Sequence, residues 1–132
     1  MNLAGKCALI AALALWMSPF LAAQQQAEMA GTWSGEATLT GMDEPNILTL
    51  KLELKEGKLA GHMTDQFGAV DADLTDIVLE GDAFNFTVPL MLPQGGEGKI
   101  LFKMKLSGES MKGEIEIPEM SVTGTWDAAK QK

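Results

Sequence analysis

The feature that most constrains the fold is a two-residue alternation of apolar and polar side chains along most of the chain. It is clearest in residues 48–55, where leucine at every second position alternates with threonine, lysine and glutamate. Successive side chains of a β-strand point to opposite faces, so this pattern predicts a strand with one buried and one solvated face. Three further rows of this kind begin at Phe84, Ile100 and Met111. No segment after residue 28 has a convincing helical period of 3.6 residues.

Turns that contain glycine separate these rows where hairpins require them. They are Glu56-Gly57, Gly81-Asp82 and the four-residue segment 107–110. Glycine suits tight hairpin turns because it accepts the positive φ that they demand. The turns set registers in which apolar faces coincide, an internal check on the pairing. The predicted partners are Leu54 with Leu59, Leu50 with Met63, Leu79 with Phe84, Ile77 with Phe86, Leu106 with Met111, Phe102 with Ile115, and Lys103 with Glu114.

These rows predict an all-β fold, an eight-stranded antiparallel up-and-down barrel, with an open β-sandwich of the same strands as the alternative. Pairing of the first strand with the last would remove the exposed edges of the sheet. A phase slip between Leu74 and Ile77 indicates a bulge near Asp76. The predicted strands are 31–39, 47–55, 58–65, 70–80, 83–91, 99–106, 111–117 and 120–127.

The first 23 residues differ in kind from the rest and are typical of a secretory signal peptide. Lys6 precedes an apolar run from Ala8 to Met17, and Leu21-Ala22-Ala23 ends the segment mostly with small residues. The run is about half the 20 or so residues that a membrane span needs. We therefore predict cleavage near Ala23 and a secreted or periplasmic protein. The domain plan is a signal peptide 1–23, an N-terminal tail 24–30, a barrel 31–127 and a C-terminal tail 128–132.

The composition of the predicted mature chain excludes several classes of partner. Cys7 is the only cysteine and leaves with the signal peptide, so no disulfide or thiolate metal site is expected. Nine lysines stand against 18 carboxylates, a net charge of −9, and the chain has neither arginine nor tyrosine. Nucleic acid is not an expected partner, because phosphate binding needs clustered basic residues. We also expect no stable membrane insertion after cleavage and no cofactor.

Gly31-Thr32-Trp33 is a Gly-x-Trp motif that opens the predicted meander of hairpins, and Gly124-Thr125-Trp126 repeats it in the last strand. On this pattern the chain resembles the lipocalin, avidin and fatty-acid-binding superfamily of small barrels. The resemblance extends over nearly the whole mature chain and implies an interior that holds one small ligand. The tyrosine of avidin sites, the arginine and tyrosine of fatty-acid binders and the lipocalin arginine under the first tryptophan have no counterpart here.

The candidate ligand site is the barrel interior, where inward side chains would contact a small apolar or amphipathic ligand. The candidate contact residues are Trp33, Trp126, Phe86, Phe102, Met63 and Met104. Small inward residues suit either a cavity or tight packing: Gly35, Ala37, Gly61 and Gly113. The alternative is a filled barrel that acts through its surface, as an accessory subunit or inhibitor of another exported protein. Three outward apolar residues motivate this second hypothesis: Val78, Met91 and Leu101.

The sequence offers little for catalysis or metal binding, and we predict no enzyme activity. His62 is the only histidine and is expected on the outer face, opposite Lys51. Asp71 and Asp73 alternate with apolar residues, which favours a solvated strand face over a cation site shared with Asp65 and Asp76. The glycine-rich segment 93–98 is expected to be a loop at the barrel rim.

Overall fold

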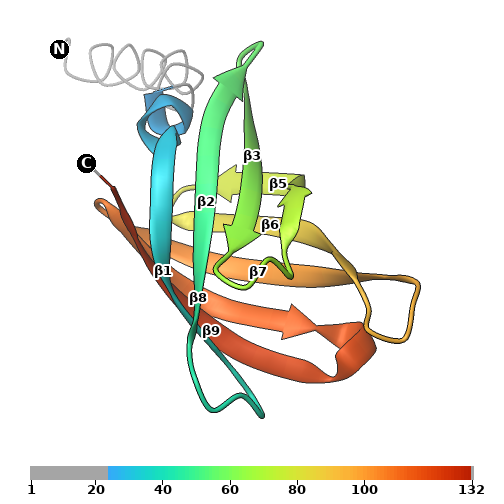
Figure 1. The fold of residues 1–132 in the computed structure, drawn as a ribbon. Coiled ribbons are helices and arrows are strands. Elements are labelled where there is room, and N and C mark those ends of the chain that lie inside the picture. Colours follow the sequence, from blue (N-terminus) through green and yellow to red (C-terminus); the bar gives the residue numbers. More distant parts are fainter. Residues whose placement is uncertain (1–23, 132) are drawn as a thin grey trace, which may run out of the picture.

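The computed structural model describes residues 24–131, and these form one antiparallel sheet that curls into a nearly closed barrel (Figure 1). The predicted all-β class is therefore confirmed. The predicted signal peptide lies outside the described residues. The strand order in the sheet is β4-β3-β2-β1-β9-β8-β7-β6-β5. The strands are β1 Gly31–Leu39, β2 Asn46–Lys55, β3 Lys58–Asp65, β4 Asp71–Asp73, β5 Thr75–Glu80, β6 Ala83–Met91, β7 Glu97–Ser107, β8 Ser110–Ile117 and β9 Val122–Lys130.

The first and last strands pair with one another, as predicted, so that Ala37 of β1 lies opposite Trp126 of β9. The two edges of the sheet meet at the segment predicted as one strand over 70–80, and we call this meeting the second seam, after the β1–β9 pairing. The structure divides this segment into β4 and β5. The two halves bond to opposite edges of the sheet. Leu74 N–H donates to Gly61 O of β3 at 2.9 Å, whereas Thr75 pairs with Thr87 of β6. Because one continuous segment bonds to both edges, the sheet has nine strands instead of eight and little free edge.

The predicted bulge near Asp76 is confirmed. Asp76 has a φ of 51°, and the β5–β6 register shifts between Thr75 and Val78. This shift leaves Ile77 outside the regular pairs, so the predicted partnership of Ile77 with Phe86 is absent from the ladder. The remaining predicted partners all occur: Leu54 with Leu59, Leu50 with Met63, Leu79 with Phe84, Leu106 with Met111, Phe102 with Ile115, and Lys103 with Glu114.

Each predicted tail contains regular secondary structure. Residues 24–29 form a short helix, and β9 extends to Lys130 because the inward alternation of Trp126 continues to the buried Ala128. The buried Met29 of the helix accepts a hydrogen bond from Trp33 Nε1 at 2.9 Å, and the Gln25 side chain donates to Gly81 O. The helix therefore covers the end of the barrel where the 56–57, 81–82 and 108–109 turns lie. The 40–45, 66–70 and 92–96 loops and the 3₁₀ turn Pro118–Met120 surround the opposite end, called here the open end.

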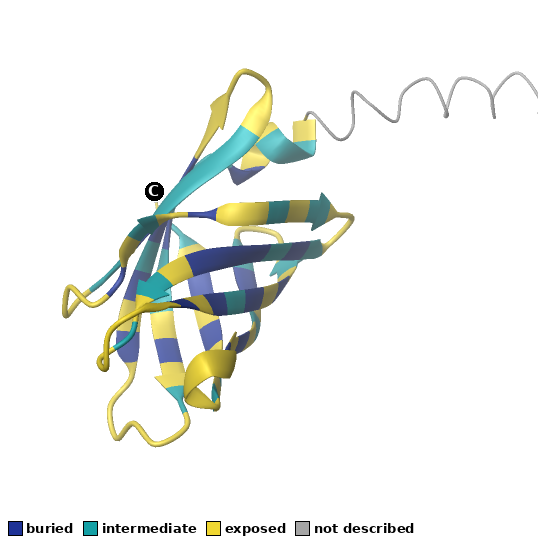
Figure 2. Cartoon of the chain, turned by 90° about the vertical axis from the view of Figure 1, so that its right-hand side faces the viewer, coloured by how far each residue is buried: buried dark blue, intermediate teal, exposed yellow. Residues whose placement is uncertain are grey.

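Buried and exposed residues alternate along the strands, as the sequence pattern requires (Figure 2). Glycines allow the backbones to approach closely around the buried indole of Trp126. A Cβ on Gly35 would lie 1.8 Å from Asp127 O, and one on Gly113 would lie 1.9 Å from Lys103 O. Gly113 lies opposite Trp126, whose Nε1 donates to Gly35 O at 3.0 Å. At these two positions the small residues serve tight packing.

Candidate ligand-binding site

The six predicted contact residues form most of a packed aromatic and methionine centre. The rings of Phe86 and Phe102 are stacked with centroids 4.6 Å apart, and Phe102 meets the edge of Trp126 at 5.7 Å. Such offset and edge-to-face pairs fill space well and add to the stability gained from burial. All six side chains are buried: Trp33, Trp126, Phe86, Phe102, Met63 and Met104. The middle of the barrel is therefore core, and room for a ligand must be sought toward its ends.

An apolar pocket of about 170 Å³ lies at the open end. Its walls come from β1, β2, β6, β7 and β8, together with the loops before β2 and before β4. Of the six predicted residues, only Phe102 contributes, at the inner end of the pocket. The lining residues are Ala37, Leu39, Met42, Asn46, Leu48, Ala69, Val70, Leu90, Ile100, Phe102, Ile115 and Ile117.

Other depressions in the described part of the chain have a different character. Trp33 lines one of about 630 Å³ between the helix and the turns at 81–82 and 108–109. Glu28, Glu109 and Lys130 contribute to that depression, so its wall carries charges of both signs. Ligand pockets are usually lined by apolar side chains with a few placed polar groups. The pocket at the open end fits this description best.

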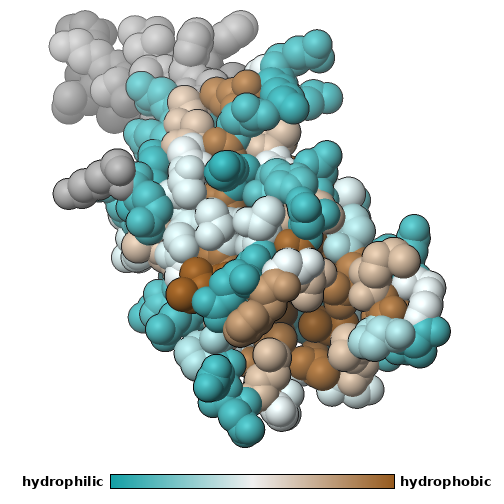
Figure 3. Space-filling view, viewed as in Figure 1, coloured by the Kyte–Doolittle hydropathy of each residue, from teal (hydrophilic) through white to brown (hydrophobic). Residues whose placement is uncertain are grey.

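Exposed apolar side chains also lie in the segments around the pocket. Phe67 of the β3–β4 loop is 63% exposed, and Met91 at the end of β6 is 70% exposed. Met42 of the β1–β2 loop and Met120 of the 3₁₀ turn are exposed as well. Apolar surface gathers over this side of the molecule, at the lower right of Figure 3. Met42, Phe67, Met91 and Met120 thus form an exposed apolar rim next to the apolar pocket.

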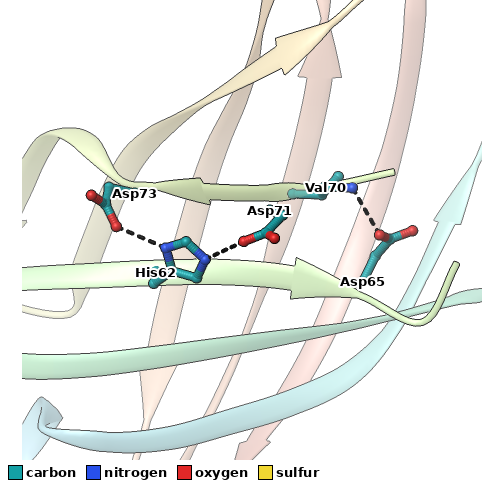
Figure 4. A network of polar contacts seen from close by, with 5 residues as sticks. All are labelled: His62, Asp65, Val70, Asp71 and Asp73. Carbon is teal, nitrogen blue, oxygen red and sulfur yellow. Dashed lines mark hydrogen bonds and ion pairs between the residues drawn. The ribbon is translucent and has the colours of Figure 1, made fainter. Parts of the chain in front are cut away.

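One carboxylate organises the loop that forms part of the pocket wall. Asp65 ends β3, and its Oδ1 accepts a hydrogen bond from Val70 N–H at 2.8 Å (Figure 4). Its Oδ2 accepts from Asn46 Nδ2 at 3.0 Å and from Phe67 N–H at 3.4 Å. Burial acts to raise the pKa of Asp65, but the hydrogen bonds from Val70, Asn46 and Phe67 outweigh it and lower the pKa below its ordinary value. Asp65 is thus a carboxylate at neutral pH and holds Ala69 and Val70 in the wall.

Sequence reasoning missed Asn46 as a site residue, although the signal was present. Asn46 has the same parity as the inward residues Leu48 and Leu50, so the alternation already places it on the buried face. Asp65 has the parity of the inward Met63, which places it on the inner side of its strand, where it meets Asn46. Two neighbouring strands that each carry a polar residue at an inward position, both at the same end of the barrel, form the pattern that would have identified this pair.

His62 lies away from the pocket, on the outer face opposite Lys51, as predicted. Its Nδ1 is 2.7 Å from Asp73 Oδ1 and its Nε2 is 2.5 Å from Asp71 Oδ1 (Figure 4). The hydrogen bonds to Asp73 and Asp71, in that order, raise the pKa of His62 above its ordinary value. Both aspartates are largely exposed, in agreement with the predicted solvated face. Within residues 24–131, no three His, Cys, Asp or Glu side chains are placed to hold a metal ion.

No protein-family model matches the chain, and no curated protein sequence matches it. In the part of the chain that the structure describes, no helix has the length and apolar character to cross a membrane.

Proposed function

We propose that the mature chain is an exported, non-catalytic binding module that holds a small apolar or amphipathic ligand in the pocket at the open end of the barrel. The observation that carries this proposal is the apolar pocket of about 170 Å³ in a barrel whose centre is otherwise filled by aromatic side chains. The exposed apolar rim formed by Phe67, Met91 and Met42 supports it. Exposed apolar surface next to a pocket is typical of binding sites.

The size of the pocket limits the ligand. A dry cavity of about 150 Å³ lined by Leu, Ile and Phe is known to bind benzene. A pocket of about 170 Å³ therefore suits a single substituted ring or one end of a longer chain. A binding free energy of about 0.6 kcal/mol per non-hydrogen atom lies within the range for small ligands. A substituted six-membered ring with about eight non-hydrogen atoms would then bind with a Kd of about 0.3 mM.

The resemblance to lipocalins is consistent with this proposal. Gly31-Thr32-Trp33 begins β1, and Trp33 lies buried below the short helix that covers one end of the barrel. With one end covered, a ligand would enter at the opposite end, where the pocket lies. The predicted signal peptide would deliver such a module to the cell exterior or the periplasm.

The experiment is a titration of the purified mature protein with 4-methylphenol, in which isothermal titration calorimetry measures the Kd. Ala69 is exposed and lines the pocket, so Ala69→Phe should fill the mouth and weaken binding at least about tenfold. Ala60→Phe adds the same volume on the outer face of β3, next to Glu53, and should leave binding unchanged. Equal binding by both variants, or no binding by the wild type at 3 mM, would contradict the proposal.

A second candidate function is docking of another exported protein on the open end. Most of the exposed large apolar side chains in the described residues lie there: Met42, Ile47, Phe67, Met91 and Met120. The test is affinity capture from the native envelope with the wild type and with a Phe67→Ser, Met91→Ser double variant. A stoichiometric partner that the double variant loses would favour docking. A partner held equally by both proteins would exclude this surface.

A further inference from the structure

The pocket wall contains one polar atom that the described residues leave without a partner. Asn46 lines the pocket and is only 9% exposed, and its Oδ1 is buried and accepts no hydrogen bond. A buried acceptor without a donor costs free energy, since it has given up water and gained nothing in exchange. Few groups of this kind persist in folded proteins, and each calls for an explanation.

The orientation of the Asn46 amide follows from its neighbour. Asp65 is ionised, and an ionised carboxylate has only acceptors. The Asn46 group that faces it must therefore be the Nδ2 donor, at 3.0 Å from Asp65 Oδ2. The reversed amide would bring two oxygens together at that distance. The backbone N–H of Val70 occupies the other carboxylate oxygen, which keeps Asp65 in position. Asn46 is thus held with its acceptor turned away from Asp65.

We propose that Asn46 Oδ1 accepts a hydrogen bond from the ligand, so that the pocket selects compact neutral molecules with a hydroxyl or N–H donor. This inference rests on the proposed function, because it assigns a polar contact to the same pocket. A hydrocarbon of the same shape leaves the acceptor unpaired. A carboxylate ligand would bring a second negative charge close to Asp65, within a chain whose mature part is already acidic. The ligand class is therefore small phenols, alcohols and amides.

Access to Oδ1 requires a small movement of the wall, because this atom is itself buried although Asn46 lines the pocket. The wall includes Met42, whose side chain is 44% exposed at the mouth. Methionine is unbranched and changes rotamer easily, so it can make room for a donor at little cost. The pocket thus combines a rigid apolar inner end at Phe102 with an adaptable outer wall.

The test compares three ligands that share a methyl-substituted ring: 4-methylphenol, p-xylene and 4-methylbenzoate. Calorimetric titration of the wild type should give a Kd for 4-methylphenol about tenfold lower than that for p-xylene, the gain expected from pairing one buried acceptor. 4-Methylbenzoate should bind more weakly than both. In Asn46→Leu, which is similar in size and has no acceptor, p-xylene should bind at least as tightly as 4-methylphenol.

A second variant is needed because Asn46→Leu removes the Nδ2 donor to Asp65 together with the Oδ1 acceptor. Asp65→Asn keeps an acceptor for Val70 N–H and removes the charge that orients Asn46, so it should reduce the preference for 4-methylphenol. Equal affinity of the wild type for 4-methylphenol and p-xylene would overturn the assignment of Asn46 and leave the binding function standing. Absence of binding by both compounds would overturn the proposed function as well.

Discussion

The single histidine of the chain ties the short strand β4 to β3 at the second seam of the barrel. His62 contacts Asp73 and Asp71, two residues of β4, from the neighbouring strand. The pKa of His62 is raised in the folded state, so the contact stabilises the folded protein. This stabilisation is fully present at pH values below the unfolded pKa of about 6.5. This contribution is lost as the pH rises through the folded pKa, because the imidazole then loses its positive charge.

We predict that His62, followed by NMR through its one ring Cε1–H signal, titrates above pH 6.5. Asp73→Asn should lower the pKa of His62 toward 6.5, because the hydrogen bond that the His62 ring donates to the Asp73 carboxylate is the largest cause of the shift. Asp76→Asn removes a charge from the nearby bulge and should have a much smaller effect; asparagine also accepts the positive φ at this position. A wild-type pKa at or below 6.5 would contradict the geometry of the cluster.

The close approach of β1 and β9 predicts that Gly35 does not tolerate a side chain. A methyl group there would lie 1.8 Å from Asp127 O, so Gly35→Ala must separate the two strands and should cost about 3 kcal/mol of unfolding free energy in urea denaturation. Gly61→Ala is the matched control, since its methyl would lie 2.8 Å from a side-chain methyl of Leu52 and 3.1 Å from the nearest backbone atom, Lys51 O. Its cost should be about 1 kcal/mol. Similar losses in the two variants would contradict this account.

At the scale of elements, the N-terminal helix is predicted to contribute to stability and not to ligand binding. Met29 is buried and its carbonyl accepts from Trp33 Nε1, whereas the neighbouring Glu28 is exposed. Met29→Ala should lower the unfolding free energy by about 2–3 kcal/mol, and Glu28→Ala should change it little. Both variants should keep the wild-type affinity for 4-methylphenol, because the helix lies at the opposite end from the pocket. A loss of affinity in Met29→Ala alone would contradict that separation.

The strands could be predicted from the sequence because the alternation of apolar and polar side chains within each strand shows which of its faces is buried. β1, β3 and β6 begin and end as expected, and the bulge at Asp76 was visible as a slip of phase. The helix at 24–29 was not visible, because six residues are too few to display a helical period. The division of 70–80 was not visible either, since which edge a residue bonds to depends on strands distant in sequence.

At the scale of the whole molecule, the alternation identifies which side chains point inward but not how completely they fill the interior. The six predicted contact residues were correctly expected inside, yet packing consumes the room around them, as the 4.6 Å stacking of Phe86 on Phe102 illustrates. The remaining room lies toward the open end, where smaller residues such as Ala37 and Ala69 face the pocket. Volume is a property of the assembled barrel, and no single strand encodes it.

The proposal that a small ligand binds in the pocket at the open end is tested most directly by locating the ligand. Intermolecular NOEs between 4-methylphenol and the methyl groups of the protein provide this location. Binding at the open end predicts contacts from the ring protons to Ile115, Ile117 and Val70, which line the pocket. Contacts to the methyl group of Met29 would place the ligand at the opposite end and contradict the account. So would the absence of any NOE at ligand concentrations several times the expected Kd of about 0.3 mM.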